Sequence, residues 1–256
     1  MLQHPTIERL EQLRLAGMAR ALSAQGQQVD IGELSFEDRL GLLIDSEVAE
    51  RESRQNASRL KRAKLKLAAT PEDVNWRHRR GLDRTLFTRL MTLDWVRAHH
   101  NVIICGPTGV GKTYLACALA NQACRQGVSA LYVRLPRLLP ALAIARADGS
   151  YVKTLAQLAR TELLVIDDWG LAPLSDEGRR DLLELVDDRH ANRSTIVTSQ
   201  VPVPHWHQAI GDPTMADAIL DRLVHNAHCL NLDGESLRKT QRPDAIDGLT
   251  SATPSE

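Results

Sequence analysis

Apolar residues in the first part of the chain recur every three or four positions. Ile7, Leu10 and Leu13 follow this spacing near the start. A second periodic stretch begins after residues 35–38, where a serine with two acids in the next three positions is typical of a helix start. No β-branched alternating run interrupts the sequence before about residue 75. This pattern predicts a helical region, with Gly26 in the turn between two helices.

The pattern changes beyond about residue 76. Five short apolar runs follow, at residues 102–105, 130–133, 163–166, 195–198 and 228–232. Each run has the length of a buried strand, and helical stretches separate the runs. Strands that alternate with helices favour βαβ units and a mainly parallel sheet. We therefore expect an α/β fold with a five-stranded parallel sheet flanked by helices.

These patterns divide the chain into three regions. Residues 1–75 form a small all-α N-terminal domain, to which we assign DNA or partner binding. Residues 76–240 form the α/β domain. Residues 241–256 are rich in Pro, Ser, Thr and Asp, and we expect them to be a disordered tail.

A phosphate-binding motif follows the first predicted strand. The sequence matches the pattern GxxxxGK[ST], with an apolar run before it and a helical run after it. Glycines let the backbone wrap around phosphate, and the N-terminus of the following helix favours negative charge. The alternative is a glycine-rich turn that binds nothing. The predicted nucleotide-binding residues are Gly106, Pro107, Thr108, Gly109, Val110, Gly111, Lys112 and Thr113.

Two carboxylates follow the third predicted strand and complete the predicted site. Lys112 is expected to reach the β- and γ-phosphates of ATP, and the Thr113 hydroxyl to ligate Mg²⁺. Asp167 suits a place in the Mg²⁺ shell, and Asp168 suits the catalytic role of orienting or deprotonating the attacking water. On its own, a strand that ends in two aspartates is more often a turn or a cap.

The fourth predicted strand also ends in polar residues, Ser199 and Gln200. Either side chain could lie between the two carboxylates and the γ-phosphate and respond to its presence. A capped strand end is the alternative. The sequence does not choose between Ser199 and Gln200.

Charge is unevenly distributed, although the net charge is zero. Residues 1–50 hold 4 basic and 9 acidic residues, whereas residues 51–97 hold 13 basic and 5 acidic residues. Such a basic segment is a plausible footprint for DNA phosphates, with little base readout because few aromatic residues lie near it. A solvated helix face is the alternative. The basic residues are Arg51, Arg54, Arg59, Lys61, Arg62, Lys64 and Lys66, then Arg77, Arg79 and Arg80, and a third set at Arg134, Arg137, Arg146 and Lys153.

Composition places the chain among ordinary globular proteins, with 43% hydrophobic and 25% charged residues. No apolar run approaches the roughly 20 residues that span a bilayer. The four cysteines form no CxxC pair, and we expect them to be reduced thiols. The start of the chain lacks the pattern of a secretory signal. A cytoplasmic protein without membrane contact is therefore expected.

Four segments together resemble the IstB-like family. They read GPTGVGKTYLACAL, LYVRLPRLL, LLVIDDWGLAPL and IVTSQVPVPHWHQAIGDPTMADAILDRLVHNAH. Members of this family are AAA+ ATPases encoded beside a transposase in insertion sequences, and they are related to DnaC-type helicase loaders. The resemblance covers roughly residues 5–240. It implies an AAA+ P-loop NTPase fold, a homo-oligomer with ATP sites shared between subunits, and largely non-specific DNA binding.

The resemblance also assigns two arginines. Arg222 occupies the position of an arginine finger that enters the neighbouring subunit's site as a catalytic residue; the alternative is a surface ion pair with Asp217 or Asp221. Arg238 could contact the nucleotide as a second phosphate sensor. A solvated basic pair is the alternative there, because the chain ends too soon for a full helical lid.

The predicted function is a Mg²⁺-dependent ATPase that assembles on double-stranded DNA and assists a transposase encoded by the same element. ATP binding would assemble subunits on the duplex and recruit the transposase, and hydrolysis would release them. One alternative is a DnaC-like loader of the replicative helicase, and another is an ATP-gated DNA scaffold with negligible turnover.

Overall fold

The computed structural model describes residues 5–237. It consists of two compact units, Met1–Lys61 and Arg62–Glu256. The predicted domain boundary near residue 75 stays a prediction. The predicted tail at residues 241–256 and Arg238 lie outside the described residues.

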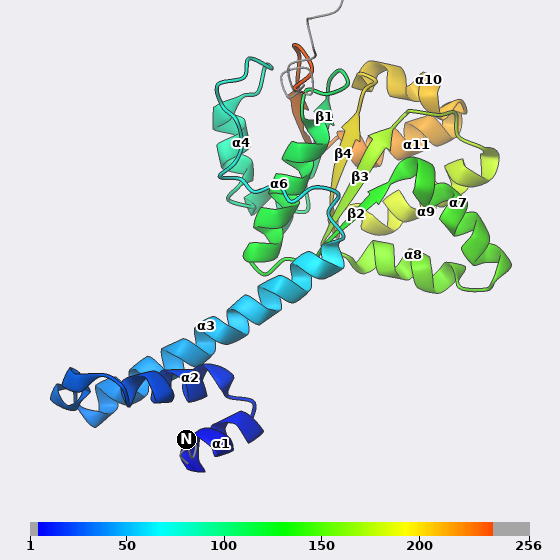
Figure 1. The fold of residues 1–256 in the computed structure, drawn as a ribbon. Helices are drawn as coiled ribbons and strands as arrows, with labels where there is room; N and C mark the ends of the chain where they lie inside the picture. Colours follow the sequence, from blue (N-terminus) through cyan, green and yellow to red (C-terminus); the bar gives the residue numbers. More distant parts are fainter. Residues whose placement is uncertain (1–4, 238–256) are drawn as a thin grey trace, which may run out of the picture. The chain divides into compact units, whose positions relative to one another are not determined.

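The first unit is helical, as the apolar spacing predicts (Figure 1). Gly26 follows the second helix and caps it, in agreement with the predicted turn. The third helix is the longest in the described residues and ends at Ala63, just inside the second unit. The elements are α1 (Pro5–Gln12), α2 (Ala16–Gln25), the 3-10 helix η1 (Val29–Glu33) and α3 (Phe36–Ala63).

A buried carboxylate joins α2 to α3. The Glu47 side chain of α3 accepts hydrogen bonds from the backbone N–H groups of Gly17, at 2.8 Å, and Met18, at 3.3 Å. Ser46 of the same helix donates to the Gly17 carbonyl at 3.0 Å. The first N–H groups of a helix have no partner within the helix. Glu47 therefore caps α2 from a distant part of the chain.

The second unit is built on a five-stranded sheet with the strand order β2-β3-β4-β1-β5 (Figure 1). Every pairing in this sheet is parallel. Strand order and direction confirm the predicted α/β fold, and each of the five predicted apolar runs lies within or overlaps a strand. The strands are β1 (Asn101–Cys105), β2 (Ala130–Arg134), β3 (Leu163–Trp169), β4 (Ser194–Ser199) and β5 (Ala227–Asn231).

Helices cover both faces of the sheet. Alternate strand residues point to opposite faces. Ile103, Leu164 and Val197 belong to the core under the helices from α7 to α11, while α6 contacts β1, β2, β3 and β4. The helices are α4 (Arg84–Leu90), α5 (Asp94–Arg97), α6 (Lys112–Arg125), α7 (Leu135–Ala147), α8 (Tyr151–Arg160), α9 (Asp176–Arg189), the 3-10 helix η2 (Val203–His205), α10 (Trp206–Ile210) and α11 (Pro213–Val224).

The strand order fixes where the candidate site lies. Carboxyl ends of parallel strands meet at one edge of the sheet. The loop after β1 and the two aspartates at the end of β3 therefore share that edge, and β4 runs between these two strands. No helix among residues 5–237 is long and apolar enough to cross a bilayer.

Candidate nucleotide site

The loop after β1 has the backbone that the glycine pattern predicts. Three glycines of this loop have positive φ angles, which residues with a Cβ rarely adopt. The angles are 151° at Gly106, 87° at Gly109 and 99° at Gly111. A Cβ at Gly106 would lie 2.4 Å from the Leu232 carbonyl oxygen. Helix α6 begins at Lys112, directly after the loop. Loop and helix N-terminus thus form the arrangement that binds phosphate groups.

Arg80 packs under this loop, which differs from its predicted place in a basic DNA-binding face. Its side chain is buried, with 2% of its surface exposed. Nη1 donates to the Val110 carbonyl at 3.2 Å and Nη2 to the Asn75 carbonyl at 3.4 Å. Burial lowers the pKa of this guanidinium from its ordinary value. Arg80 is therefore part of the nucleotide site's support and is inaccessible to DNA.

Lys112 and Thr113 lie at the start of α6. The Lys112 ammonium donates to the carbonyls of Gly106 at 2.7 Å and Pro107 at 2.8 Å, which directs it into the concave side of its own loop. The Thr113 hydroxyl lies 3.0 Å and 3.1 Å from the two carboxylate oxygens of Asp167. A hydroxyl and a carboxylate at this separation are the oxygen ligands that Mg²⁺ prefers. The residues present therefore fit a magnesium site.

Asp167 is almost fully buried, with 1% of its surface exposed, and is surrounded by donors. Besides Thr113, the Tyr132 hydroxyl donates to Oδ2 at 2.5 Å, and the Thr198 hydroxyl donates to Oδ1. Burial alone would raise the pKa of this carboxyl group. The hydroxyl hydrogen bonds, led by that of Thr198, act together with the positive charge of Lys66; they outweigh burial and lower the pKa of Asp167 below its usual value. The carboxylate is therefore held in its ionised form.

Asp168 has a different environment. Its φ angle is +64°, a left-handed conformation, and the pairing of β3 with β4 shifts register at this point. Arg134, the last residue of β2, donates from Nε to the Asp168 carboxylate at 2.6 Å. The irregular backbone thus directs the two neighbouring carboxylates to different partners.

The strand β4, which lies between β1 and β3, ends at the polar residue Ser199 and is followed by Gln200. Gln200 Oε1 accepts a hydrogen bond from the Thr108 hydroxyl at 2.6 Å. The Ser199 hydroxyl is buried and donates to the Trp169 carbonyl at 2.9 Å. The choice between Ser199 and Gln200 as sensor stays a prediction; of the two, Gln200 touches the phosphate loop.

Two residues of this site were not singled out by the sequence pattern. Thr198 contacts both aspartates, because its hydroxyl donates to Asp167 and accepts from the Asp168 backbone N–H at 3.3 Å. Tyr132 reaches Asp167 from β2. Both lie one or two residues from a strand end on strands next to β3, and only the strand order reveals that neighbourhood.

Arg222 lies at the amino ends of the strands, opposite the ends that carry the phosphate loop and the aspartates. Its carbonyl accepts a hydrogen bond from the Asn101 side chain at 3.2 Å, and Asn101 begins the strand whose other end carries the phosphate loop. Strand β1 separates these ends by roughly 13 Å at about 3.3 Å per residue. The Arg222 guanidinium pairs with Asp187 at 2.5 Å, rather than with Asp217 or Asp221. Arg222 and Lys112 are therefore not brought together within one chain.

The predicted basic surfaces are partly engaged with acids. On α3, Arg51 pairs with Glu47 and Arg54 pairs with Glu50, each at 2.7 Å. In the third basic set, Arg146 pairs with Glu177 at 2.5 Å and with Asp181, and Arg134 pairs with Asp168. Arg137 and Lys153 of this set are exposed.

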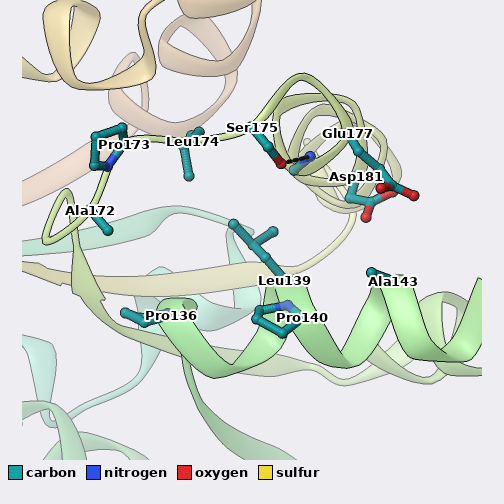
Figure 2. Close-up of a pocket in the computed structure, with 11 residues that line it drawn as sticks. Pro136, Leu139, Pro140, Ala143, Ala172, Pro173, Leu174, Ser175, Glu177 and Asp181 are labelled. Atoms are coloured by element: carbon teal, nitrogen blue, oxygen red, sulfur yellow. Dashed lines mark hydrogen bonds between the residues drawn. The ribbon is translucent and has the colours of Figure 1, made fainter.

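An apolar pocket of about 320 Å³ lies away from the phosphate loop. Figure 2 shows it between α7, the loop after β3 and the first turn of α9. Pro136, Leu139 and Pro140 form one wall, and Pro173 and Leu174 face them. The pocket lacks a cluster of free charged groups, since Glu177 and Asp181 at its rim pair with Arg146. This lining does not resemble a site for phosphate.

The fold and this geometry define a P-loop nucleotide-binding protein with an AAA+ fold. The chain belongs to the family of IstB-like ATP binding proteins, whose family model matches residues 8–245. A protein of Sinorhizobium fredii named as an insertion sequence ATP-binding protein is 53% identical over 242 residues, which span 94% of this chain and 99% of the relative.

Solved structures agree with the fold. The crystal structure of DnaI aligns with a TM-score of 0.57 at 23% identity, over 64% of this chain and 91% of DnaI. The crystal structure of the DnaC helicase loader aligns with a TM-score of 0.50 at 20% identity, over 60% of this chain and 93% of that protein. At these identities the likeness shows the fold alone. It confirms the predicted AAA+ fold and its relation to helicase-loader structures.

Proposed function

We propose that this protein is a Mg²⁺-dependent ATPase that assembles on double-stranded DNA and assists the transposase of its insertion sequence. The observation that carries the proposal is the hydrogen bond from the Thr113 hydroxyl, at the end of the phosphate loop, to the Asp167 carboxylate on β3, at 3.0 Å. That pair joins a phosphate-binding and a metal-binding element in a chain whose relative is named as an insertion sequence ATP-binding protein. The rest of the site supports a hydrolytic role.

Each residue of the site has a distinct role in this proposal. Lys112 binds the β- and γ-phosphate oxygens of ATP. Thr113 and Asp167 hold Mg²⁺, which when bound neutralises charge on the phosphates. Asp168 orients or deprotonates the attacking water, and Gln200, beside Thr108, responds to the γ-phosphate.

The arginine finger would come from a second subunit. The separation of Arg222 from the phosphate loop within one chain supports a site completed by another copy. A guanidinium brought to the γ-phosphate stabilises the charge that develops during phosphoryl transfer. Its ion pair with Asp187 would then be exchanged for the nucleotide of the neighbouring subunit.

Binding to duplex DNA would use the basic segment beyond residue 50. Lys61 and Lys64 are exposed residues of this segment, and Arg59 is partly exposed. They suit sequence-independent contacts with phosphates. ATP binding would favour the assembled state on DNA and recruit the transposase, and hydrolysis would release the assembly.

Fluorescence anisotropy tests this proposal directly. Labelled duplex and single-stranded DNA are titrated with protein, with and without ATP and Mg²⁺, at two salt concentrations. We expect ATP-dependent duplex binding that weakens steeply with salt, because each neutralised phosphate releases counterions. Duplex binding that does not depend on ATP, or no DNA binding at all, would contradict the proposal.

The likeness to the DnaI and DnaC structures favours a second candidate, a loader of the replicative helicase. Such a protein would bind single-stranded DNA and a helicase ring. Preference for single strands in the anisotropy experiment would favour it. Multiple-turnover phosphate release separates both candidates from an ATP-gated scaffold that hydrolyses little ATP.

A further inference from the structure

The Lys66 side chain brings a positive charge of the protein to the predicted magnesium site. Its ammonium nitrogen lies 3.6 Å from Oδ2 of Asp167. The lysine side chain is partly exposed, at 38%, whereas the aspartate is 1% exposed. Lys66 comes three residues after the last residue of α3, in a segment without regular structure that leads to α4.

The segment that carries Lys66 is held by buried residues and by a hydrogen bond to the phosphate loop. Ala69 and Val74 are buried. Arg80, further along the same segment, donates to the Val110 carbonyl within the loop. These contacts hold the backbone near α6 and the loop, so that Lys66 reaches the carboxylate from a defined position.

The surroundings of Asp167 explain why a cation is needed there. A buried carboxylate without a cation is costly, and hydroxyl donors compensate only part of its charge. Thr113, Tyr132 and Thr198 supply neutral donors. Within the described residues, Lys66 forms the ion pair of this carboxylate.

We propose that Lys66 competes with Mg²⁺ for Asp167: its ammonium balances the carboxylate in the absence of metal and withdraws when Mg²⁺ binds with the nucleotide. The inference rests on the proposed use of Mg²⁺. Two cations at one carboxylate repel each other, so each weakens the binding of the other. Lys66 is a positioning residue in this role, and its partial exposure gives the ammonium a path to solvent.

The proposed competition predicts two separate effects of removing Lys66, one on the Mg²⁺ requirement and one on stability. Without Lys66, the Mg²⁺ concentration needed for nucleotide binding falls, because no ammonium must be displaced. Without Lys66 and without metal, the folded chain is less stable, because Asp167 loses its ion pair. A purely structural lysine would produce the second effect and not the first.

Lys66→Met tests the inference, with Arg97→Met as the control. Arg97 is also an exposed cation paired with a carboxylate, but its partner is Asp94 on α5, outside the site. Binding of a fluorescent ATP analogue to the full chain is measured while Mg²⁺ is varied. We expect the half-saturating Mg²⁺ concentration to fall roughly three- to tenfold in Lys66→Met, as for loss of a partly exposed charge interaction. Arg97→Met should match the wild type.

Thermal unfolding provides the second readout. Lys66→Met should unfold at a lower temperature than the wild type without metal, and Mg²⁺ with the analogue should narrow the difference. An unchanged or higher Mg²⁺ requirement in a folded Lys66→Met variant would overturn the inference. Wild-type analogue binding that is independent of Mg²⁺ would instead contradict the proposed metal use itself, which keeps the two failures distinct.

Discussion

At the scale of single residues, the environment of Asp167 governs the site. Three hydroxyl groups from three different elements donate to one buried carboxylate. Together with the charge of Lys66, these hydrogen bonds lower the pKa of Asp167 despite burial, which by itself would raise it. Thr198 has the largest share among these hydrogen bonds and also contacts the backbone of Asp168. The hydroxyl therefore supports the Asp167 carboxylate and the backbone of Asp168.

Thr198→Val removes this hydroxyl while keeping the shape of the side chain. We expect the free energy of unfolding at neutral pH to fall by about 1 to 2 kcal/mol, because a buried carboxylate loses a donor. A lowered folded-state pKa stabilises the protein above the pKa of the unfolded chain, and this contribution is lost as pH falls. The difference between variant and wild type should therefore shrink as the pH falls below 3.8, the ordinary value for this group.

Urea unfolding between neutral pH and about pH 3 measures this difference. Thr154→Val on α8, outside the site, serves as the control. A difference between Thr198→Val and wild type that stays constant over this range would show that the hydroxyl does not act through the ionised carboxylate.

At the scale of elements, the contact between α2 and α3 depends on one glycine. A Cβ at Gly17 would lie 2.5 Å from the Ser46 carbonyl oxygen and 2.6 Å from the Cα of Glu47. Both are backbone atoms, so a side chain cannot be accommodated by a rotamer change. Close approach of the two helices also lets Glu47 reach the free N–H groups at the start of α2.

Gly17→Ala should therefore separate α2 from α3. We expect faster hydrogen exchange in residues 5–25 and a loss of about 1 to 3 kcal/mol in local stability, as for overpacking elsewhere. Gly26→Ala is the control, since a Cβ there meets its nearest neighbour at 3.5 Å. Nucleotide binding should be unchanged in both variants; unaltered exchange in Gly17→Ala would refute the tight contact.

The sequence predicts the elements better than it predicts their contacts. Local apolar patterns identify all five strands and the long helices, because burial on a sheet or helix imposes a short period. The phosphate motif and the two aspartates are likewise local signals. Thr198 and Tyr132 lack such a signal, since their importance follows from strand order. The sequence assigns Lys66 and Arg80 to a basic DNA-binding segment, and only the path of an irregular segment brings them to the site.

At the scale of the whole molecule, the separation of Arg222 from the phosphate loop leads to a mixing experiment. Asp168→Asn and Arg222→Ala should each bind ATP and lose most hydrolysis. In a mixed assembly, some interfaces combine the intact Asp168 of an Arg222→Ala subunit with the intact Arg222 of an Asp168→Asn subunit. The proposed shared site is complete at these interfaces. Equal mixing should restore up to roughly a quarter of wild-type turnover, measured by phosphate release.

The mixture has a clear contrary result. If the two variants together hydrolyse no more ATP than their separate rates predict, Arg222 of one subunit does not act in the ATP site of another. Unaltered turnover in Arg222→Ala alone would also exclude the shared site.

The parallel direction of all five strands has one more consequence. It puts the phosphate loop on one rim of the sheet and Arg222 on the other, so subunits that share a site must associate head to tail. An open assembly of this kind is polar. One terminal subunit carries a nucleotide that no arginine contacts, and the other terminal subunit carries an arginine with no nucleotide to meet. Growth and loss of subunits should then differ between the two ends, so that nucleotide turnover would give the assembly a direction along DNA.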